Sequence, residues 1–280
     1  MTSQIAPLQP IATLDEAMDG YDGVFCDVWG VVHNGRAKFE AAEAALQGVR
    51  EAGKPVVLIT NSPRLSQGVH RQLDQIGLSR QAYDFVVTSG DVTRALIAEA
   101  DSKVFHLGPE RDLDLFEGLD VALCGEQEAA TIVATGFFDD ETETPDDYAD
   151  MLRGLAGRGL PMICANPDVV VQRGDRRIWC AGSLARAYQE LGGEVRIAGK
   201  PYRPIYELAA QRVGGIADKR VLAIGDGLAT DIKGAQTFGL DALLILAGIH
   251  ADDIEASTES VAQALREADL TARYFMPVLR

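Results

Sequence analysis

The 280-residue sequence has little positive charge, few cysteines and no long apolar run. Its 26 Lys and Arg are outnumbered by 42 Asp and Glu, so the formal net charge is −16. Because such a chain repels a phosphate backbone, we expect no nucleic-acid partner. The longest apolar stretch, residues 242–249, is far too short to span a bilayer, so we expect no membrane partner either.

The four cysteines are widely separated and form no CxxC pair. Three of them end or sit within apolar runs, so they are interpreted as buried thiols in a reducing compartment. They are Cys26, Cys124, Cys164 and Cys180. Residues 1–10 also lack the basic start and the apolar stretch of a signal peptide. The sequence therefore predicts a cytoplasmic protein.

Apolar residues are abundant, at 47% of the chain, and 28 Gly and 11 Pro supply turns for many elements. This composition excludes disordered and fibrous classes. The length fits one large domain or two smaller ones, and we favour two.

Short apolar runs alternate with segments of helical spacing. Residues 23–26 and 55–59 are typical of buried strands, whereas residues 39–51 and 65–76 have helical spacing. Strands separated by single helices pair in parallel, and ligands bind beyond the carboxyl ends of such strands. The pattern predicts a doubly wound α/β core in which the polar residues after each strand form the site.

The pattern changes between residues 98 and 193, which we interpret as an inserted second α/β domain. The first domain then comprises residues 1–97 and 194–280. Within the insertion, a β-hairpin is predicted around Gly174-Asp175, and the acidic run 139–147 is interpreted as a solvated loop leading to a helix start at Pro145. Further strands are predicted at residues 121–124, 131–135, 161–165, 195–198 and 221–224, the last two in the first domain.

Helix ends are marked by capping residues and glycines. Ser62 before Pro63 is interpreted as an N-cap and first helical residue, and Thr230 as the N-cap before Asp231. Four glycines follow helical stretches and are expected to take the left-handed conformation that ends a helix. These are Gly53, Gly77, Gly192 and Gly239.

Polar side chains follow four predicted strands, and in one parallel sheet they would project into a single crevice. They are Asp27, Thr60, Asn61, Ser62, Lys200, Asp226 and Asp231. Two carboxylates 4 Å apart repel by about 4 kcal/mol at an effective dielectric near 20, and one lysine does not neutralise three. Mg²⁺ prefers oxygen ligands, so Asp27 and Asp226 with a backbone carbonyl are expected to hold it.

A bound phosphate would add to the negative charge: three carboxylates and a phosphate dianion sum to about −5, and Mg²⁺ with Lys200 returns only about +3, so neutral donors are also needed. Ser62 and the backbone N–H groups after Asp27 supply neutral donors for it. Asp231 is expected outside the metal shell, holding Asp226 or a metal-bound water.

The order and spacing of these residues resemble the haloacid dehalogenase (HAD) superfamily of phosphohydrolases. Asp27, Ser62, Lys200 and the Asp226/Asp231 pair fall on its four motifs. The insertion lies between the second and third motifs and looks like the α/β cap, of C2 type, of subclass IIA. That subclass contains NagD-like nucleotide or sugar phosphatases and pyridoxal phosphate phosphatase. The resemblance implies a Rossmann-like core and, through the cap, a homodimer.

The resemblance also implies roles for individual residues. Asp27 would be the nucleophile and a Mg²⁺ ligand, with the Trp29 carbonyl and Asp226 as the other protein ligands. Ser62 and Lys200 would hold the transferring phosphoryl group. Four residues would bind the substrate, two beside Ser62 and two in the cap: Thr60, Asn61, Asn166 and Asp168.

One position departs from the family pattern. The family's first motif reads Asp-x-Asp, and its second Asp protonates the leaving group and activates water, but this chain has Trp29 there. An indole cannot transfer protons. Three substitutes are open: an acidic leaving group, His33 as the acid, or a cap residue such as Asp168. His33 has the alternative role of a packed or solvated side chain.

The sequence thus predicts a Mg²⁺-dependent phosphatase that acts on a small phosphorylated metabolite, such as a sugar or nucleotide phosphate, through an aspartyl phosphate. Two alternatives stay open. One is a phosphate-ester binding or regulatory protein that lost turnover through Trp29. The other is a HAD enzyme that cleaves a different bond.

Overall fold

The computed structural model describes residues 7–173, 176–216, 220–248 and 253–280. The chain forms two compact units. The first comprises Met1–Thr60, His70–Val87 and Lys200–Arg280, and the second Asn61–Val69 and Thr88–Gly199. The predicted turn Gly174-Asp175, residues 1–6 of the N-terminus and residue 249 lie outside the described residues.

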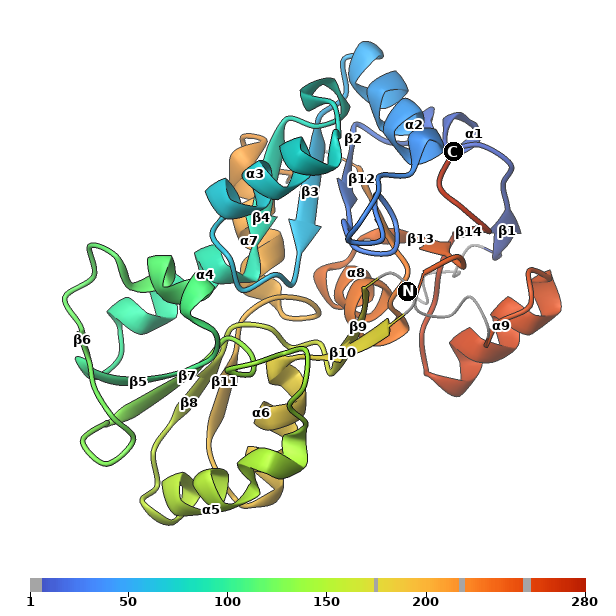
Figure 1. Cartoon of the computed structure of the whole chain (residues 1–280). Coiled ribbons are helices and arrows are strands. Elements are labelled where there is room, and N and C mark those ends of the chain that lie inside the picture. The colour runs from blue at the N-terminus through green and yellow to red at the C-terminus, as the bar shows by residue number, and fades with distance from the viewer. Residues whose placement is uncertain (1–6, 174–175, 217–219, 249–252) are drawn as a thin grey trace. The chain divides into compact units, whose positions relative to one another are not determined.

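A seven-stranded sheet forms the centre of the first unit, in the order β1-β14-β13-β12-β2-β3-β4 (Figure 1). Its described pairings are parallel. The strands are β1 (Gln9–Pro10), β2 (Gly23–Cys26), β3 (Val56–Thr60), β4 (Phe85–Thr88), β12 (Val221–Gly225), β13 (Asp241–Ile245) and β14 (Tyr274–Met276). Every residue of β2, β3 and β12 is buried, which explains their uninterrupted apolar runs.

Helices pack around this sheet and bury their apolar faces. In α2 (Glu40–Glu51), for example, Leu46 and Val49 are buried whereas Glu40 is exposed. The helices are α1 (Asp15–Met18), α2 (Glu40–Glu51), α3 (Ser66–Ile76), α7 (Arg203–Arg212), α8 (Lys233–Phe238) and α9 (Thr258–Glu267). The doubly wound parallel core predicted from the sequence is confirmed.

The second unit contains a five-stranded parallel sheet in the order β11-β8-β7-β5-β6. Tyr188, Phe137 and Leu152 are fully buried in its core. The strands are β5 (Lys103–Leu107), β6 (Ala122–Leu123), β7 (Thr131–Ala134), β8 (Met162–Cys164) and β11 (Val195–Ile197), and the helices are α4 (Ser89–Ala98), α5 (Ala149–Gly157) and α6 (Ala181–Glu190).

The predicted hairpin is present as an antiparallel pair of its own, β9 (Val170–Arg173) and β10 (Arg176–Trp179). Its arginines bind the acidic run before it. Arg173 pairs with Asp140 at 2.9 Å, and Arg176 pairs with Glu141 at 2.6 Å. The run is therefore not only a solvated loop as expected, because Asp140 is largely buried between arginines. The helix start at Pro145 is confirmed as a short 3₁₀ helix, Pro145–Tyr148.

One predicted strand lies in a different sheet from the one expected. Residues 195–198 were assigned to the first domain, but β11 pairs with β8 in the sheet of the second unit. The chain enters the first unit at Lys200, five residues after β11 begins. The sequence predicted that four strands of one sheet end at the site. Three of them, β2, β3 and β12, belong to the sheet of the first unit, and the fourth, β11, does not. A short apolar run does not specify which sheet it joins, since pairing partners are chosen by distant residues.

Two predicted N-caps are wrong. α3 begins at Ser66, because the Asp91 carboxylate accepts a hydrogen bond from the Ser66 backbone N–H at 3.1 Å, while Ser62 accepts one from the Arg64 N–H in the preceding loop. Thr230 lies inside a one-turn π-helix, Leu228–Ile232, which is capped at Gly227. Asp231, inside the same helix, accepts a hydrogen bond from the Gly227 N–H at 3.0 Å.

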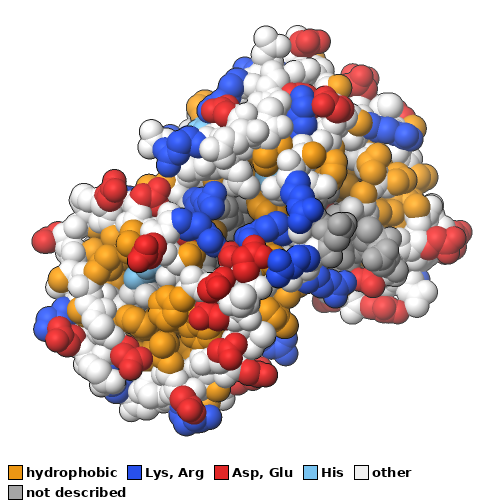
Figure 2. Space-filling model, in the orientation of Figure 1, with side chains coloured by type: hydrophobic (Ala, Val, Ile, Leu, Met, Phe, Trp, Pro, Cys, Tyr) orange, Lys and Arg blue, Asp and Glu red, His pale blue; other side chains and the backbone are white. Residues whose placement is uncertain are grey.

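Most other local predictions are confirmed. The four glycines after helices have φ between 75° and 86°. All four cysteines are free, and Cys26, Cys164 and Cys180 are buried as predicted, but Cys124 is only partly buried, so the prediction is wrong for that residue. In the described part of the chain, no helix is both long and apolar enough to cross a membrane. Acidic side chains are spread over the visible face of both units (Figure 2).

Candidate active site

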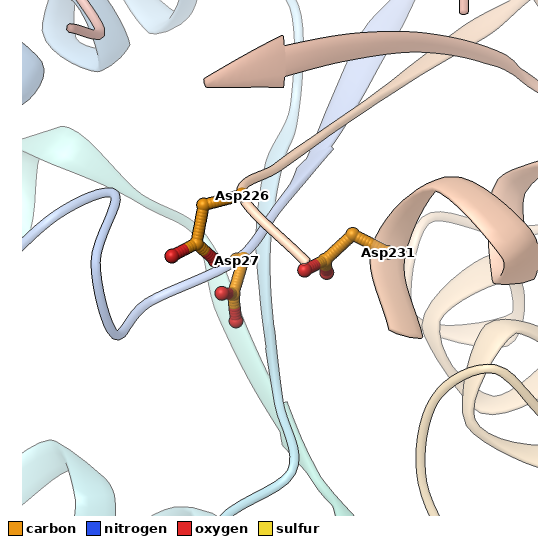
Figure 3. Close-up of side chains that lie close together, drawn as sticks. All are labelled: Asp27, Asp226 and Asp231. Carbon is orange, nitrogen blue, oxygen red and sulfur yellow. The ribbon is translucent and has the colours of Figure 1, made fainter. Parts of the chain in front are cut away.

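Two neighbouring strands of the first unit end in aspartates. β2 and β12 pair in parallel with Cys26 opposite Ile224, so Asp27 and Asp226 leave the same edge of the sheet. The Asp27 backbone N–H donates to the Ile224 carbonyl at 2.8 Å, which extends the pairing to the residue that carries the carboxylate. Both carboxylates are 7% exposed and lie side by side (Figure 3).

Asp231 completes a group of three carboxylates. Single oxygens of Asp27, Asp226 and Asp231 lie within 4.8 Å of one another. The tight turn after β12 directs Asp231 back toward the strand end, and Gly225 is required there because a Cβ on it would lie 2.2 Å from the Asp231 Cγ. The expected convergence of acidic side chains is therefore present in the structure.

Lys200 is the cation at the centre of this group. Its Nζ donates to Asp27 Oδ1 at 2.5 Å and to Asp231 Oδ1 at 2.6 Å, and the lysine is 3% exposed. Burial together with repulsion from Asp231 raises the pKa of the Asp27 carboxyl well above its usual value. Burial opposes charge on Lys200 as well, but the Asp231 and Asp27 carboxylates raise its pKa by more. The Lys200 ammonium is therefore held between the Asp27 and Asp231 carboxylates.

The group fits a hard divalent cation. Lys200 pairs with Asp27 and Asp231, the buried carboxylate of Asp226 lies beside them, and oxygen donors at this spacing suit Mg²⁺. Two glycines close around the proposed ligand Asp226. A Cβ would lie 2.2 Å from its Oδ2 if built on Gly30 and 1.6 Å if built on Gly248. The backbone thus holds the Asp226 carboxylate in one position.

Trp29 packs on its own loop. Its indole meets the His33 ring edge to face, with centroids 5.0 Å apart, and a Cβ on Gly35 would lie 2.6 Å from it. His33 is 1% exposed, and its Nδ1 accepts a hydrogen bond from the Gly35 N–H at 2.8 Å. Burial lowers the pKa of His33 to about 4, so the ring is neutral at pH 7. These contacts favour the packing role of His33 over the role of acid.

The remaining predicted residues are divided between the units. Thr60 is the buried last residue of β3 in the first unit, and Ser62 lies in the second unit on the loop before α3. Within the second unit the Asn61 side chain donates to Asp168 Oδ1 at 2.8 Å, and the Asp168 N–H donates to Asn166 Oδ1 at 3.0 Å. Three residues expected to bind substrate are thus joined by hydrogen bonds to one another.

Sequence reasoning missed two kinds of residue here. Gly30 and Gly248 were not singled out, although a glycine just after a strand end is a recognisable signal of close backbone approach. Tyr206, a buried residue of α7, borders Asp27, Lys200 and Asp231, and no sequence signal marks it.

Comparisons with known proteins agree with this geometry. A model of haloacid dehalogenase-like hydrolases matches residues 24–122, and a second model of HAD-hydrolase-like proteins matches residues 197–268. A crystal structure of a haloacid dehalogenase-like family hydrolase from Brucella suis 1330 is 51% identical, with a TM-score of 0.89, and the alignment covers 96% of this chain and 100% of that one.

Curated relatives match over most of their length. The sugar-phosphatase AraL of Bacillus subtilis is 28% identical over 236 residues, which is 81% of this chain and 83% of that protein. The ribonucleotide monophosphatase NagD of Escherichia coli K12 is 26% identical over 242 residues, 83% of this chain and 91% of that protein. The chain therefore belongs to the haloacid dehalogenase-like hydrolases, as its motifs predicted.

Proposed function

We propose that this protein is a Mg²⁺-dependent phosphatase that hydrolyses a small phosphate ester, such as a sugar or nucleotide phosphate, through an aspartyl phosphate on Asp27. The observation that carries the proposal is the buried ion-pair arrangement in which Lys200 holds one oxygen of Asp27 beside Asp226. The names of the relatives AraL and NagD support the substrate class.

In this mechanism a carboxylate oxygen of Asp27 attacks phosphorus, and the bond from phosphorus to the leaving oxygen breaks. Water then attacks the phosphorus of the aspartyl phosphate, the bond between phosphorus and the Asp27 oxygen breaks, and the proton of the water passes to solvent; the products are inorganic phosphate and the restored carboxylate. Lys200 orients Asp27 by holding its Oδ1, so Oδ2 is the oxygen left for attack. Asp231 keeps the lysine in place from its other side.

Asp27 and Asp226, with the Trp29 carbonyl, would hold the metal. A divalent cation there neutralises charge on the phosphoryl oxygens. Ser62, carried over from the family's second motif, would donate a hydrogen bond to the phosphoryl group. In the same proposal the inserted residues 98–193 are the C2-type cap, and Asn166 and Asp168 of the cap bind substrate. The protein dimerises through the cap, and its free cysteines fit a cytoplasmic location.

Trp29 restricts the substrates that this site can use. Its indole lies against His33 and Gly35 and offers no proton to a leaving oxygen. We therefore infer that leaving groups that depart as stable anions, such as aryl or acyl groups, react fastest. The same feature favours a second candidate, a protein that binds phosphate esters without turnover.

A phosphate-ester screen of the purified protein with Mg²⁺ tests the proposal. Asp27→Asn should abolish hydrolysis, because an amide cannot form the aspartyl phosphate. Asp150→Asn, at a side chain that is 98% exposed, makes the same chemical change away from the site and should leave the rate unchanged. Steady hydrolysis by the Asp27→Asn protein would rule out the mechanism. Protection from thermal unfolding by an ester, without any product from the wild-type protein, would establish the binding protein instead.

A further inference from the structure

A small cavity borders the ion pairs of Lys200 in the first unit. Its volume is about 10 Å³. The wall consists of four apolar side chains and four polar ones: Phe25, Ile59, Ala223 and Ile224, and Asp27, Lys200, Tyr206 and Asp231. The proposed metal ligand Asp27 belongs to this wall, whereas the other proposed carboxylate ligand, Asp226, does not.

Tyr206 lines this cavity, and its packing against α8 holds it in place. The residue lies in α7 and is 2% exposed. Its ring stacks on Phe238 at the end of α8, with centroids 5.4 Å apart and planes 25° apart. Gly234 in the same helix makes room for the hydroxyl, because a Cβ there would lie 2.2 Å from the Tyr206 oxygen. The ring is therefore held by α8 at both its face and its tip.

The cavity suits one ordered water. About 10 Å³ is near the minimum that a water needs, and buried waters require two to four polar partners. An ammonium, two carboxylates and a phenol at the wall meet that requirement. Buried tyrosine hydroxyls usually have a hydrogen-bond partner, and a water in this cavity would provide one for Tyr206.

We propose that Tyr206 is a positioning residue of the active site, and that its hydroxyl holds an ordered water which fixes the Lys200–Asp231 ion pair. A fixed pair keeps the Lys200 Nζ on Asp27 Oδ1 and so orients the nucleophile. Tyr206 touches neither the metal ligand Asp226 nor a substrate in this proposal. Its kinetic consequence rests on the proposed phosphatase function, whereas the water and the lysine position do not.

Tyr206→Phe tests the proposal, because it keeps the stacked ring and removes only the hydroxyl. We expect kcat with p-nitrophenyl phosphate and Mg²⁺ to fall about 3- to 10-fold, with KM changed less than about twofold, as for loss of one hydrogen bond that acts through orientation. Crystal structures of both proteins should show a water at Tyr206 in the wild type, and a changed Lys200 position in the variant.

Tyr188→Phe is the matched control. It removes another buried tyrosine hydroxyl, one that donates to the Leu160 carbonyl at 2.6 Å in the second unit. This variant should unfold at a lower temperature and keep its kcat. If Tyr206→Phe also loses stability but keeps its kcat, the hydroxyl is only structural and the proposal is overturned.

The crystal structures decide the matter independently of turnover. A wild-type cavity without water density, or a Lys200 that is unmoved in Tyr206→Phe, overturns the proposal. If the wild-type protein hydrolyses no ester, the proposed function fails, while a bound water and a shifted lysine still support the positioning role of Tyr206.

Discussion

Replacing Gly248 by alanine should disable the proposed metal site without removing any of its proposed ligands. The Gly248 backbone does not have a positive φ, so alanine is tolerated by the chain itself. The added Cβ, however, would lie 1.6 Å from Asp226 Oδ2, where ordinary contact begins at 3.4 Å. The carboxylate must therefore move by about 1.8 Å, the difference between these distances, or the Gly248 backbone must retreat by as much.

Metal sites tolerate ligand shifts of only about 0.2 Å, and a misplacement of about 1 Å at a reacting centre can cost about 10²-fold in rate. We expect kcat/KM with p-nitrophenyl phosphate to fall at least about 100-fold. The Mg²⁺ concentration that gives half-maximal rate should rise at least about tenfold. Titration of the rate with Mg²⁺ measures both, and thermal unfolding with and without Mg²⁺ measures binding separately.

Gly48→Ala is the control, since Gly48 lies inside α2 with nothing within 4 Å of an added Cβ. It should stabilise the protein by about 0.5–1 kcal/mol and leave the response to Mg²⁺ unchanged. The reasoning is refuted if Gly248→Ala folds and keeps its half-saturating Mg²⁺ within about threefold of the wild type.

Two further predictions remain: one concerns proton transfer to the leaving group, and the other concerns protonation of a buried histidine and the stability of the fold. The rate of hydrolysis by the wild-type protein should fall steeply as the leaving-group pKa rises. Trp29→Asp should flatten that slope and raise the rate of hydrolysis of alkyl phosphates by about 10²-fold or more. A flat slope in the wild-type protein would reveal another acid. Burial lowers the pKa of His106, which contacts Thr135 at 2.9 Å, to about 4 in the folded state against 6.5 for the exposed residue. The unfolded chain therefore binds more protons between these values, and His106 alone should lower the stability by about 1 kcal/mol as the pH drops from 7.5 to 5.5, in addition to any loss from His33. Urea unfolding at both pH values should show that loss shrinking in His106→Gln, and an unchanged loss would assign it elsewhere.

Local signals in the sequence located most of the elements that carry the site. Apolar runs marked β2, β3 and β12 because these strands are buried on both faces, and the aspartates directly after two of them converge because their strands are adjacent and parallel. The glycines after helices were found for the same local reason, since a left-handed residue there needs no distant partner.

Local signals failed where a distant residue makes the decision. Ser62 has the residue type of an N-cap, but the start of α3 is set by the carboxylate of Asp91, 25 residues from Ser66. Thr230 is not an N-cap, because it lies inside the π-helix that begins at Leu228, and the Asp231 side chain folds back to accept a hydrogen bond from the Gly227 N–H. The strand before Lys200 was assigned to the wrong sheet, because its apolar run suits either sheet and its partner β8 decides.

By itself the sequence determined the family, the acidic residues of the site and the expectation of a cation, because motif spacing and excess negative charge are properties of the chain order. Only the tertiary structure decided that Lys200 joins Asp27 to Asp231, that Gly248 fixes Asp226, and that Tyr206 faces their cavity. These relations depend on side-chain atoms a few ångströms apart whose residues are far apart in the sequence, 173 positions for Lys200 and Asp27, and packing alone sets such distances.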